Sequence, residues 1–580
     1  MKTPVLNPNR SHPVNRALAA WLLLLALIAT APAQPVATPH NILLLIADDF
    51  GIDNLSLYNT NPAASVVAAP NITALGQGGV VFTHFYARPS CSQSRACVFT
   101  GRDSFRTGVG VALPLGPALR TNEYTLPRAF ATNAPQYDLA TIGKWHLDPG
   151  PNSPLTTGGW TNAAIFLGPQ VSNYTNWTKV VNGVSTISTN YTTSDQVNDA
   201  TNWIQSRGAN PWFLWLAFNA PHLPRHKPPV NLLTTPRYIN LSGAAADIST
   251  NGRAYYEAMI EALDTEIGRL LTVVNLTNTD VILIGDNGTE IDVQQQPFKN
   301  ANFAETTTGN GHAKFTIYEG GARTPLIVAG PDVGSPGRRN DSLVAEPDLF
   351  ATIQELAGIN VAATLPTNVV IDSVSLLPAI RADVIRPTPF LIEEQFNQGA
   401  DGVTLRNDRF KLIHFYSHVE QFFDLANDPY EYTNLLLNPP LSAVAQSNYN
   451  TIKLKLGDYQ TLANSERTRN LVPYPAVNGA GFTNGSFSVN AQFAQLSTNG
   501  FFQNLNAPYP TKYANGGTNL NYQVILWRSA DLRDPLAWSP VATNLVTGIT
   551  NNFLVTTNGL LTDANANADH YFYRISPYVP

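Results

Sequence analysis

Cysteine and charge are both scarce in this chain of 580 residues. It has two cysteines, and charged residues make up 13% of it, about half of the ~25% that is usual in soluble domains. Two cysteines cannot build a disulfide framework, and a formal net charge of −6 offers no basic surface for nucleic acid. We therefore expect a globular protein of at least two domains that acts on small molecules or polar polymers.

The first 33 residues have the organisation of an export signal. Basic residues precede an apolar stretch over residues 17–28, and Ala31-Pro32-Ala33 is typical of a cleavage site. The apolar stretch is shorter than the ~20 residues of a membrane-spanning helix, although an uncleaved membrane anchor is the alternative. We expect residues 1–33 to be a signal peptide, with no stable membrane span, and the mature protein to be exported to the periplasm, the cell surface or the medium.

Both cysteines lie in one short segment, residues 91–102. The proline at position 89 disfavours helix before it, and Gly101 is a typical helix end, so we expect a helix that begins beside Cys91. A helix N-terminus favours an anion. A disulfide from Cys91 to Cys97 would need α-carbons within ~7 Å, which the ends of nearly two helical turns do not readily meet. Cys97 is therefore predicted to be a small buried side chain.

Two unbroken apolar segments, residues 40–47 and 280–285, each end in acidic residues. Such strands are typical of a parallel sheet covered on both faces, and ligands of these sheets bind beyond the carboxyl ends of the strands. Each acidic pair alone also fits a turn or a helix cap, but together they favour a hard cation, calcium before magnesium. The side chains concerned are Asp48, Asp49, Asp286 and Asn287.

Imidazole and ammonium groups follow two other predicted strands. Lys144 and His146 are two residues apart, so an extended segment would point both to one side. That pair suits an anion and a proton transfer. His222 lies between two prolines, which fix the backbone around it, whereas His226 has no motif of its own.

These segments together resemble the conserved motifs of the sulfatase family. Residues 91–102 resemble the signature Cys-x-Pro-Ser-Arg-x-x-x-x-Thr-Gly-Arg, but glutamine stands at position 93, where the family has proline or, in some bacteria, alanine. Residues 143–147 resemble Gly-Lys-Trp-His-Leu, residues 221–224 resemble Pro-His-x-Pro, and residues 314–325 resemble a lysine followed by Tyr-Glu-Gly-Gly-x-Arg-x-Pro. The motifs follow one another in the family's order.

The resemblance implies an α/β fold like that of alkaline phosphatase. We expect a large mixed, mostly parallel sheet flanked by helices in a catalytic domain over residues 38–380, and a smaller C-terminal α+β subdomain over residues 385–470. Residues 472–499 look like a polar linker. Strand patterns between turns rich in asparagine and threonine predict a small β-rich appendage over residues 500–580, whose role is a carbohydrate contact, a surface contact or a spacer.

The resemblance also implies the chemistry: hydrolysis of a sulfate ester with a bound calcium ion and a formylglycine (3-oxoalanine), which a formylglycine-generating enzyme makes from Cys91. The implied metal ligands are Asp48, Asp49, Cys91, Asp286 and Asn287. The implied catalytic residues are Cys91, Arg95, Lys144, His146, His222 and Lys314, of which Lys144, His222 and Lys314 also bind the substrate.

The expected substrate is a sulfated carbohydrate or another sulfate ester. Aromatic residues in the region 151–195 would suit sugar rings as part of a pocket wall, although packing explains them equally well; they are Trp160, Tyr174, Trp177 and Tyr191. Two other functions stay open. One is a phosphonate or phosphodiester hydrolase with the same site, and the other is an unmodified, catalytically silent binder of sulfated glycans. Gln93 bears on the second, because the aerobic modifying enzyme is expected to read Cys-x-Pro-x-Arg.

Overall fold

The structure is a computed structural model. It describes residues 39–470 apart from residue 63 and the segments 299–310, 387–389, 397–400 and 417–418, and beyond residue 470 it describes eight strands. The predicted signal peptide lies outside these residues. Among the helices described, none has the length and apolar character needed to cross a membrane.

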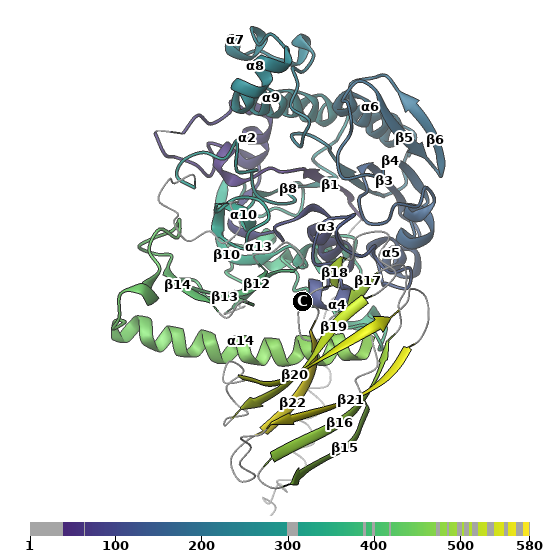
Figure 1. Cartoon of the computed structure of the whole chain (residues 1–580). Helices are drawn as coiled ribbons and strands as arrows, with labels where there is room; N and C mark the ends of the chain where they lie inside the picture. Colours follow the sequence, from purple (N-terminus) through teal and green to yellow (C-terminus); the bar gives the residue numbers. More distant parts are fainter. Residues whose placement is uncertain are drawn as a thin grey trace, which may run out of the picture. The chain divides into compact units, whose positions relative to one another are not determined.

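A ten-stranded mixed sheet lies at the centre of the described chain (Figure 1). The strand order is β10-β2-β9-β8-β1-β7-β3-β4-β5-β6. The strands from β8 to β4 run parallel, β9 is antiparallel to both of its neighbours, and the β5–β6 hairpin extends one edge. The predicted mixed, mostly parallel sheet is confirmed. Its strands are β1 (Asn41–Ala47), β2 (Val80–Tyr86), β3 (Asp138–Lys144), β4 (Asn162–Phe166), β5 (Trp177–Val181), β6 (Val184–Ser188), β7 (Trp212–Ala217), β8 (Thr279–Gly285), β9 (Leu326–Ala329) and β10 (Arg338–Ala345).

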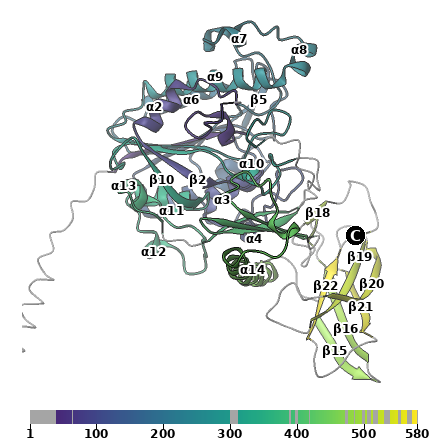
Figure 2. The same cartoon turned by 90° about the vertical axis from the view of Figure 1, so that its left-hand side faces the viewer.

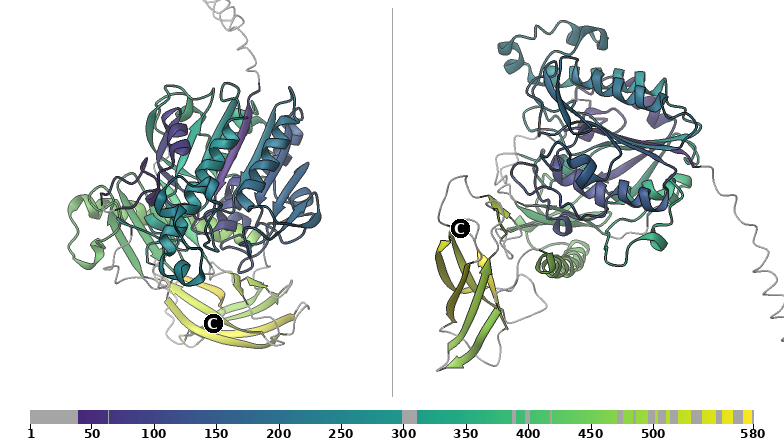
Figure 3. Two further views of the ribbon diagram at one scale, coloured as in Figure 1. Left: turned by 90° about the horizontal axis from the view of Figure 1, so that it is seen from above. Right: turned by 90° about the vertical axis from the view of Figure 1, so that its right-hand side faces the viewer.

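Helices cover both faces of this sheet (Figures 2 and 3). Successive residues of β1 point to opposite faces, so Leu43 belongs to one hydrophobic core and Leu44 to the other. Burial on both faces explains why β1 is apolar throughout. The first core lies under α2 (Pro70–Gln77), α6 (Thr192–Gln205) and α9 (Gly252–Leu271), and the second under α3 (Cys91–Thr100), α5 (Leu126–Asn133) and α11 (Asp348–Leu356).

Shorter helices connect these elements. They are α4 (Ser104–Thr107), α7 (Pro236–Ile239), α8 (Ala245–Thr250), α10 (Glu319–Ala322), α12 (Val361–Thr364) and α13 (Leu377–Arg381).

A second, antiparallel sheet of four strands follows the main sheet in the chain. Its strands are β11 (Leu391–Gln395), β12 (Gly402–Arg406), β13 (Phe410–Phe415) and β14 (Glu420–Asp424). Helix α14 (Ala443–Asn470) packs on it, and Ile452 and Leu456 of the helix share a buried cluster with Leu412. The salt bridge from Lys411 Nζ to Glu319 Oε1, 3.1 Å long and fully buried, joins this sheet to α10.

The last part of the chain is rich in antiparallel strands. Strand β16 pairs along its length with β21, and β15 pairs with β16. The linker expected over residues 472–499 is therefore wrong, because the β-rich region begins at Ala476. The sequence of β16, in which polar and apolar residues alternate from Ser486 to Phe493, is the pattern of a strand with one apolar face. The strands are β15 (Ala476–Thr483), β16 (Ser486–Gln495), β17 (Phe501–Gln503), β18 (Pro510–Lys512), β19 (Leu520–Ser529), β20 (Ser539–Ile549), β21 (Val555–Asp563) and β22 (Phe572–Tyr578).

Candidate active site

The acidic side chains that follow β1 and β8 lie together at the carboxyl ends of these strands. Ala47 is opposite Gly285 in the parallel pair, so the next residue of each strand emerges at the same edge of the sheet. The backbone N–H of Asp49 donates to Asp286 Oδ1 at 3.1 Å, and Asn287 Nδ2 donates to Asp49 Oδ1 at 2.7 Å. Asp48, Asp49, Asp286 and Asn287 are all buried. The strand pattern predicted this juxtaposition.

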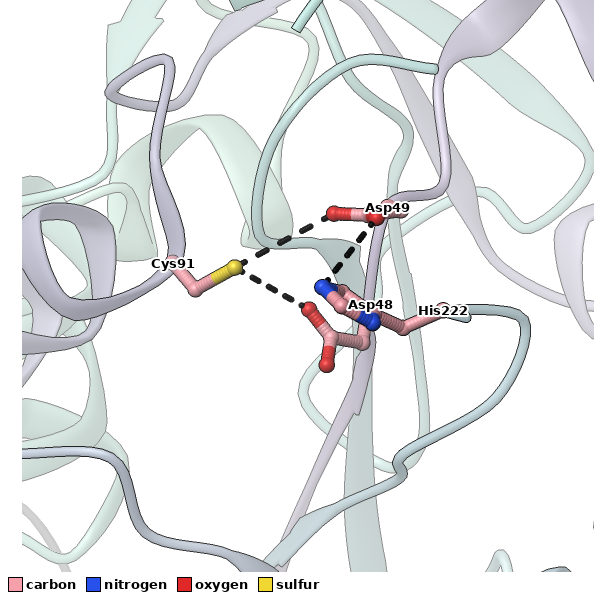
Figure 4. Close-up of side chains that lie close together, drawn as sticks. All are labelled: Asp48, Asp49, Cys91 and His222. Atoms are coloured by element: carbon pink, nitrogen blue, oxygen red, sulfur yellow. Dashed lines mark hydrogen bonds and ion pairs between the residues drawn. The ribbon is translucent and has the colours of Figure 1, made fainter. Parts of the chain in front are cut away.

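Cys91 is the first residue of α3, as predicted, and its thiol faces the carboxylates (Figure 4). The sulfur lies 3.3 Å from Asp48 Oδ1 and 4.0 Å from Asp49 Oδ1. Burial and the neighbouring Asp48 raise the pKa of this thiol well above its ordinary value, so it is un-ionised at neutral pH. Cys91 and Cys97 are both free thiols, and Cys97 is buried, as the helical spacing predicted.

The backbone of Asp49 has the left-handed conformation, with a φ of 63°. Residues other than glycine rarely adopt it, so neighbouring groups have to hold it. The hydroxyl of Tyr256, on α9, donates to the Asp49 carbonyl oxygen at 2.6 Å. Tyr256 in turn accepts a hydrogen bond from Asn54. Helix α9 thereby fixes the direction in which the Asp49 carboxylate points.

Two buried lysines balance the charge of the carboxylates. Lys144 Nζ, at the end of β3, lies 2.6 Å from Asp48 Oδ2, and Lys314 Nζ lies 2.6 Å from Asp49 Oδ1. Burial alone would lower the pKa of Lys314, but the charge of Asp49 outweighs it and raises this pKa well above its ordinary value. Lys314 therefore stays cationic at neutral pH.

Arg95 comes from the second turn of α3 and holds Asp286. Its Nε and Nη2 lie 3.0 Å and 2.7 Å from Asp286 Oδ2, and its Nη1 donates to the Lys144 carbonyl oxygen at 2.7 Å. Burial and the charge of Asp48 raise the pKa of Asp286 to about 6, although Arg95 acts in the opposite direction. One arginine thus links the helix that carries Cys91 to both β3 and β8.

Two histidines reach the site from separate loops. His222 Nδ1 lies 3.2 Å from the Leu223 carbonyl, which can only accept, so Nε2 is the ring atom that faces Asp49 Oδ2, 3.5 Å away. His146 Nε2 lies 2.8 Å from the Leu113 carbonyl, and its buried Nδ1 has no hydrogen-bond partner among the described residues. Burial lowers the pKa of His222 to about 3 and that of His146 well below its ordinary value. Both rings are therefore neutral at neutral pH.

One sequence argument is wrong although the residue does lie where it was expected. Strand β3 ends at Lys144, and His146 has a φ of 53°, so the turn after the strand, rather than a period of two, directs the His146 ring. Of the two explanations given for the aromatic side chains of the region 151–195, packing holds, because all four are buried in the hydrophobic cores; they are Trp160, Tyr174, Trp177 and Tyr191.

Tyr174 shows what this packing achieves. Its hydroxyl lies 2.7 Å from the carbonyl oxygens of Asn219 and His222, and its ring stacks on His226 at 4.1 Å between centroids. His226 is thus a packing residue, in agreement with its lack of a motif. Tyr174 thereby supports the backbone of the loop that carries His222.

Sequence reasoning missed two charged residues beside Lys314. Glu290 Oε1 lies 3.9 Å from Lys314 Nζ, and Glu290 Oε2 lies 3.1 Å from Arg225 Nη2. Burial and the charge of Asp49 raise the pKa of Glu290 to about 7. The sequence did contain a signal for them, because each is close in the chain to a predicted site residue: Glu290 follows Asn287 by three residues, and Arg225 follows His222 by three.

The donor atoms of the site fit a divalent cation. Ligand atoms of Asp48, Asp49, Cys91 and His222 lie within 4.8 Å of one another. Asp49 Oδ2 and Asn287 Oδ1 are buried and accept no hydrogen bond within the described part of the chain. Buried oxygens without a donor are costly, and carboxylate and amide oxygens are ligands of hard cations such as calcium. The residues present therefore suit the ion that the sequence motifs imply.

Gln93, the residue that departs from the family signature, is buried beside Cys91. Its Nε2 donates to Ser104 Oγ at 2.9 Å and to the Glu394 carbonyl oxygen at 2.7 Å, and its Oε1 accepts from Ser90 Oγ at 3.2 Å. The glutamine side chain is therefore fully used, and it connects α3 to α4 and β11.

Comparison with protein families gives two matches. Residues 40–359 match the family described as Sulfatase, and residues 311–456 match the family described as N-sulphoglucosamine sulphohydrolase, C-terminal. The first match alone spans more than half of the chain. The two matches overlap over the segment that carries Lys314.

Comparison with individual proteins agrees with these matches. The N-acetylgalactosamine-6-sulfatase of Canis lupus familiaris is 28% identical over 409 residues, which cover 64% of this chain and 72% of that protein. Arylsulfatase A of Homo sapiens is 27% identical over 453 residues, which cover 70% of this chain and 80% of the relative.

Solved structures show the same fold. The crystal structure of Ps i-CgsB in complex with k-i-k-neocarrahexaose has a TM-score of 0.60 at 22% identity and covers 73% of this chain and 93% of its own. A structure described as a complex with its substrate D-glucosamine-2-N,6-O-disulfate has a TM-score of 0.56 at 19% identity and covers 75% of this chain and 99% of its own.

Proposed function

Because the chain belongs to the sulfatase family, and is a sulfatase, we propose that it removes sulfate from a sulfated carbohydrate with a formylglycine derived from Cys91 and a bound calcium ion. The observation that carries the proposal is the position of residue 91. Its sulfur lies 3.3 Å from Asp48 Oδ1, at the N-terminus of a buried helix and beside two lysines. An anionic ester brought to this point meets positive charge and free backbone N–H groups.

Calcium would be held by Asp48, Asp49, Asp286, Asn287 and the modified residue 91. The buried Asp49 Oδ2 and Asn287 Oδ1, which accept no hydrogen bond from the residues that the structure describes, support this assignment. When bound, the ion supplies electrostatic stabilisation to the negative charge that develops around sulfur. The modified residue 91 supplies, as its hydrated aldehyde, a hydroxyl nucleophile.

The nucleophile needs groups that orient it and remove its proton. Asp286 suits the second task, because its carboxylate lies at the sheet edge beside Asp49 and its pKa is raised to about 6. Arg95 holds Asp286 Oδ2, and Lys144 stands on the other side of the site against Asp48. These two cations orient residue 91 and the sulfate oxygens.

Proton transfer to the departing alcohol is assigned to His222 Nε2 and Lys314 Nζ. Both atoms face Asp49. Lys314 keeps its proton at neutral pH, whereas the neutral His222 ring, whose proton is on Nδ1, would give a proton from Nε2 only after the anionic ester has raised its pKa and the ring has become charged. His146 Nδ1 is buried and has no donor among the described residues, so it is free to accept the proton that is given up when sulfate is released. The substrate-binding groups in this scheme are Lys144, His222 and Lys314.

A sulfated sugar is the proposed substrate class, since relatives are named as N-acetylgalactosamine-6-sulfatases and one structural neighbour is described with a sulfated glucosamine. We further propose that residues 1–33 direct export, that residues 38–380 and 385–470 form the catalytic domain and its subdomain, and that the β-rich segment is an appendage.

The test combines chemistry at residue 91 with two substrates. Mass spectrometry of the tryptic peptide that contains residue 91 should show loss of sulfur and gain of a carbonyl. The same preparation should hydrolyse 4-nitrophenyl sulfate faster than bis(4-nitrophenyl) phosphate. A faster reaction with the phosphate diester would favour the phosphodiesterase.

An unmodified, silent binder of sulfated glycans is the second candidate, and the glutamine at position 93 is the observation that favours it. An intact thiol throughout the preparation, with no turnover and with retained binding of a sulfated glycan, would support that candidate.

A further inference from the structure

We infer that Arg225 and Glu290 form a second contact site, beside the sulfate-binding lysine, that recognises neighbouring hydroxyl groups of an uncharged sugar ring. The inference rests on the proposed function, because it concerns the alcohol part of the same substrate. It assigns specificity to two residues outside the motifs that perform the chemistry.

The pair lies on the side of the site from which the alcohol departs. Glu290 Oε1 is 3.9 Å from Lys314 Nζ, and Lys314 itself contacts Asp49 Oδ1. Arg225 lies in the same loop as His222, three residues later. The two residues assigned to the leaving oxygen, His222 and Lys314, therefore each have one member of the pair as a neighbour.

Both side chains are partly open to solvent, in contrast to the closed centre of the site. The side chain of Glu290 is 18% exposed and that of Arg225 is 11% exposed, whereas that of Lys314 is 3% exposed. A ligand that occupies the centre can therefore reach the pair without a rearrangement of the core.

The pair keeps unused hydrogen-bonding capacity. Arg225 Nη2 contacts Glu290 Oε2 at 3.1 Å and Asp292 Oδ1 at 2.6 Å, but its buried Nε has no acceptor among the described residues. Glu290 Oε1 has only the distant ammonium of Lys314 beside it in the described chain. Glu290 Oε1 offers an acceptor, and the N–H groups of Arg225 that Glu290 and Asp292 do not occupy offer donors, which together match a hydroxyl group because it both donates and accepts.

The charge around Arg225 disfavours a second anionic group on the substrate at this contact site. One guanidinium stands against two carboxylates, Glu290 and Asp292, so above the raised pKa of Glu290 these three side chains sum to one negative charge. A sulfate or carboxylate on the adjacent carbon would meet like charge, which costs binding energy. We therefore expect a sugar that carries hydroxyls, not a second anion, next to its sulfate ester.

The packing of Arg225 favours a role in substrate recognition over that of a merely structural ion pair. A side-chain atom built at Gly252, the first residue of α9, would touch the Arg225 stem at 3.5 Å, so the stem lies against the start of that helix. This packing restricts the position of the Arg225 stem and therefore of its guanidinium group. A site built to bind a hydroxyl discriminates strongly against a ligand that lacks it.

The test compares substrates with and without hydroxyls in three variants. Glu290→Gln removes the charge of the acceptor, Arg225→Lys removes the forked donor, and Asp292→Asn is the matched control, because it removes only the more exposed partner of Arg225. The substrates are 4-nitrophenyl sulfate and a panel of neutral hexoses with one sulfate at position 3, 4 or 6. The readout is the ratio of kcat/KM on the best hexose sulfate to kcat/KM on the aryl sulfate.

We expect this ratio to fall about 10-fold to 100-fold in Glu290→Gln and Arg225→Lys, as for the loss of a hydroxyl contact, and to change less than about 3-fold in Asp292→Asn. Wild-type enzyme should also prefer singly sulfated hexoses to disulfated ones. An equal fall on both substrates would show that Glu290 acts through Lys314 alone, and an unchanged ratio would show no contact. Either result overturns the inference.

Failure of the proposed function gives a different pattern, because wild-type protein would then hydrolyse no sulfate ester. In that case calorimetry with the hexose sulfates decides the inference. Weaker binding by Glu290→Gln than by Asp292→Asn supports it, and equal binding overturns it. Thermal melting of each variant identifies any loss of folding.

Discussion

Arg95 binds Asp286 through two nitrogens, with Nε at 3.0 Å and Nη2 at 2.7 Å from the same carboxylate oxygen. Both groups are buried, and the second turn of α3 is thereby tied to the residue that follows β8. The position of Cys91, at the start of the same helix, depends on this ion pair as well as on helix packing.

We predict that Asp286→Ala removes turnover and lowers the free energy of unfolding by about 3 kcal/mol, because it leaves the buried charge of Arg95 without its main partner. Turnover is measured with 4-nitrophenyl sulfate and stability by urea denaturation. Asp264→Asn is the control, since Asp264 is another buried carboxylate that binds backbone N–H groups of α2, remote from the site. It should cost stability and keep turnover. Activity in Asp286→Ala would mean that the site is misassigned.

Removal of calcium should abolish activity and lower the melting temperature, because only the folded chain brings the oxygen ligands of the ion together, so the ion would bind the folded state alone. A ligand at a hundred times its Kd stabilises a protein by about 2.7 kcal/mol. Dialysis against a chelator, followed by titration with calcium or magnesium, measures both effects. Calcium should restore activity at the lower concentration, since it tolerates irregular oxygen sites better. Full activity after exhaustive chelation would contradict the proposal.

Lys314→Ala should reduce kcat/KM on 4-nitrophenyl sulfate by about 10²-fold to 10³-fold, the usual cost of one oriented charge in a site of this kind. Lys179→Ala is the control, because Lys179 lies on β5 and pairs with Asp195 and Asp199 away from the site. A change of similar size in both variants would point to a general effect on stability. Circular dichroism of the variants checks that they are folded.

Gln93→Pro should increase the fraction of residue 91 that is converted to formylglycine, because it restores the motif that the modifying enzyme is expected to read. Proline is tolerated in the first turn of a helix, and Gln93 is the third residue of α3. The variant loses the bonds to Ser104 and Glu394, so its unfolding free energy should fall by about 1–3 kcal/mol. Gln93→Ala, with alanine as in some bacterial relatives, provides the comparison. Mass spectrometry of co-expressed protein measures conversion, and equal conversion in all three proteins would refute the role given to position 93.

A pH-dependent contribution to stability is expected from Asp280, at the end of the sheet opposite the site. Burial and the charge of Asp332 raise the pKa of Asp280 to about 7, against about 3.9 in an unfolded chain. Between these values the folded protein binds more protons than the unfolded one, so this carboxyl lowers stability as pH rises from 4 to 8. The neighbouring charged groups are His40, whose Nδ1 lies 3.5 Å away, and Arg381, which pairs with Asp332.

Asp280→Asn removes this titration. Its unfolding free energy relative to wild type should therefore rise by on the order of 2 kcal/mol from pH 5 to pH 8, as measured by urea denaturation at a series of pH values. The exposed Asp408, changed to Asn, serves as the control for the effect of removing one carboxylate from the surface. A flat or falling difference for Asp280→Asn would refute the assignment.

Much of the fold and site followed from local patterns. Apolar runs that end in Asp48-Asp49 and in Asp286-Asn287 predicted the strands β1 and β8. They also predicted that both strands end at the same edge of the sheet, because a few consecutive residues are enough to show that a strand is buried and where it ends. Gly101, with a φ of 67°, ends α3 as expected. Residues 252–273 and 347–358 carry the apolar period of an amphipathic helix in the sequence, and these segments contain α9 and α11.

Other features could not be read in this way, because they depend on contacts between distant segments. The direction of the His146 ring depends on the left-handed backbone conformation of His146 itself, after the end of β3, and the sequence does not reveal that conformation. The Tyr256 bond to Asp49 joins residues 207 positions apart. The pairing of Arg225 with Glu290 spans 65 positions and belongs to no motif that sequence analysis singled out.

The attachment of the four-stranded sheet to α10 has a consequence for how this enzyme can be shortened. Glu431 Oε2 accepts the Glu319 backbone N–H at 2.6 Å, and Gln421 Oε1 accepts the Tyr318 hydroxyl at 2.7 Å. Both contacts hold the turn at Tyr318 and Glu319, which follows Lys314 in the chain. A truncation after residue 380 would remove both contacts and release the segment that carries Lys314, which we assign to sulfate binding. The smaller sheet therefore belongs to the minimal enzyme and cannot be treated as an accessory.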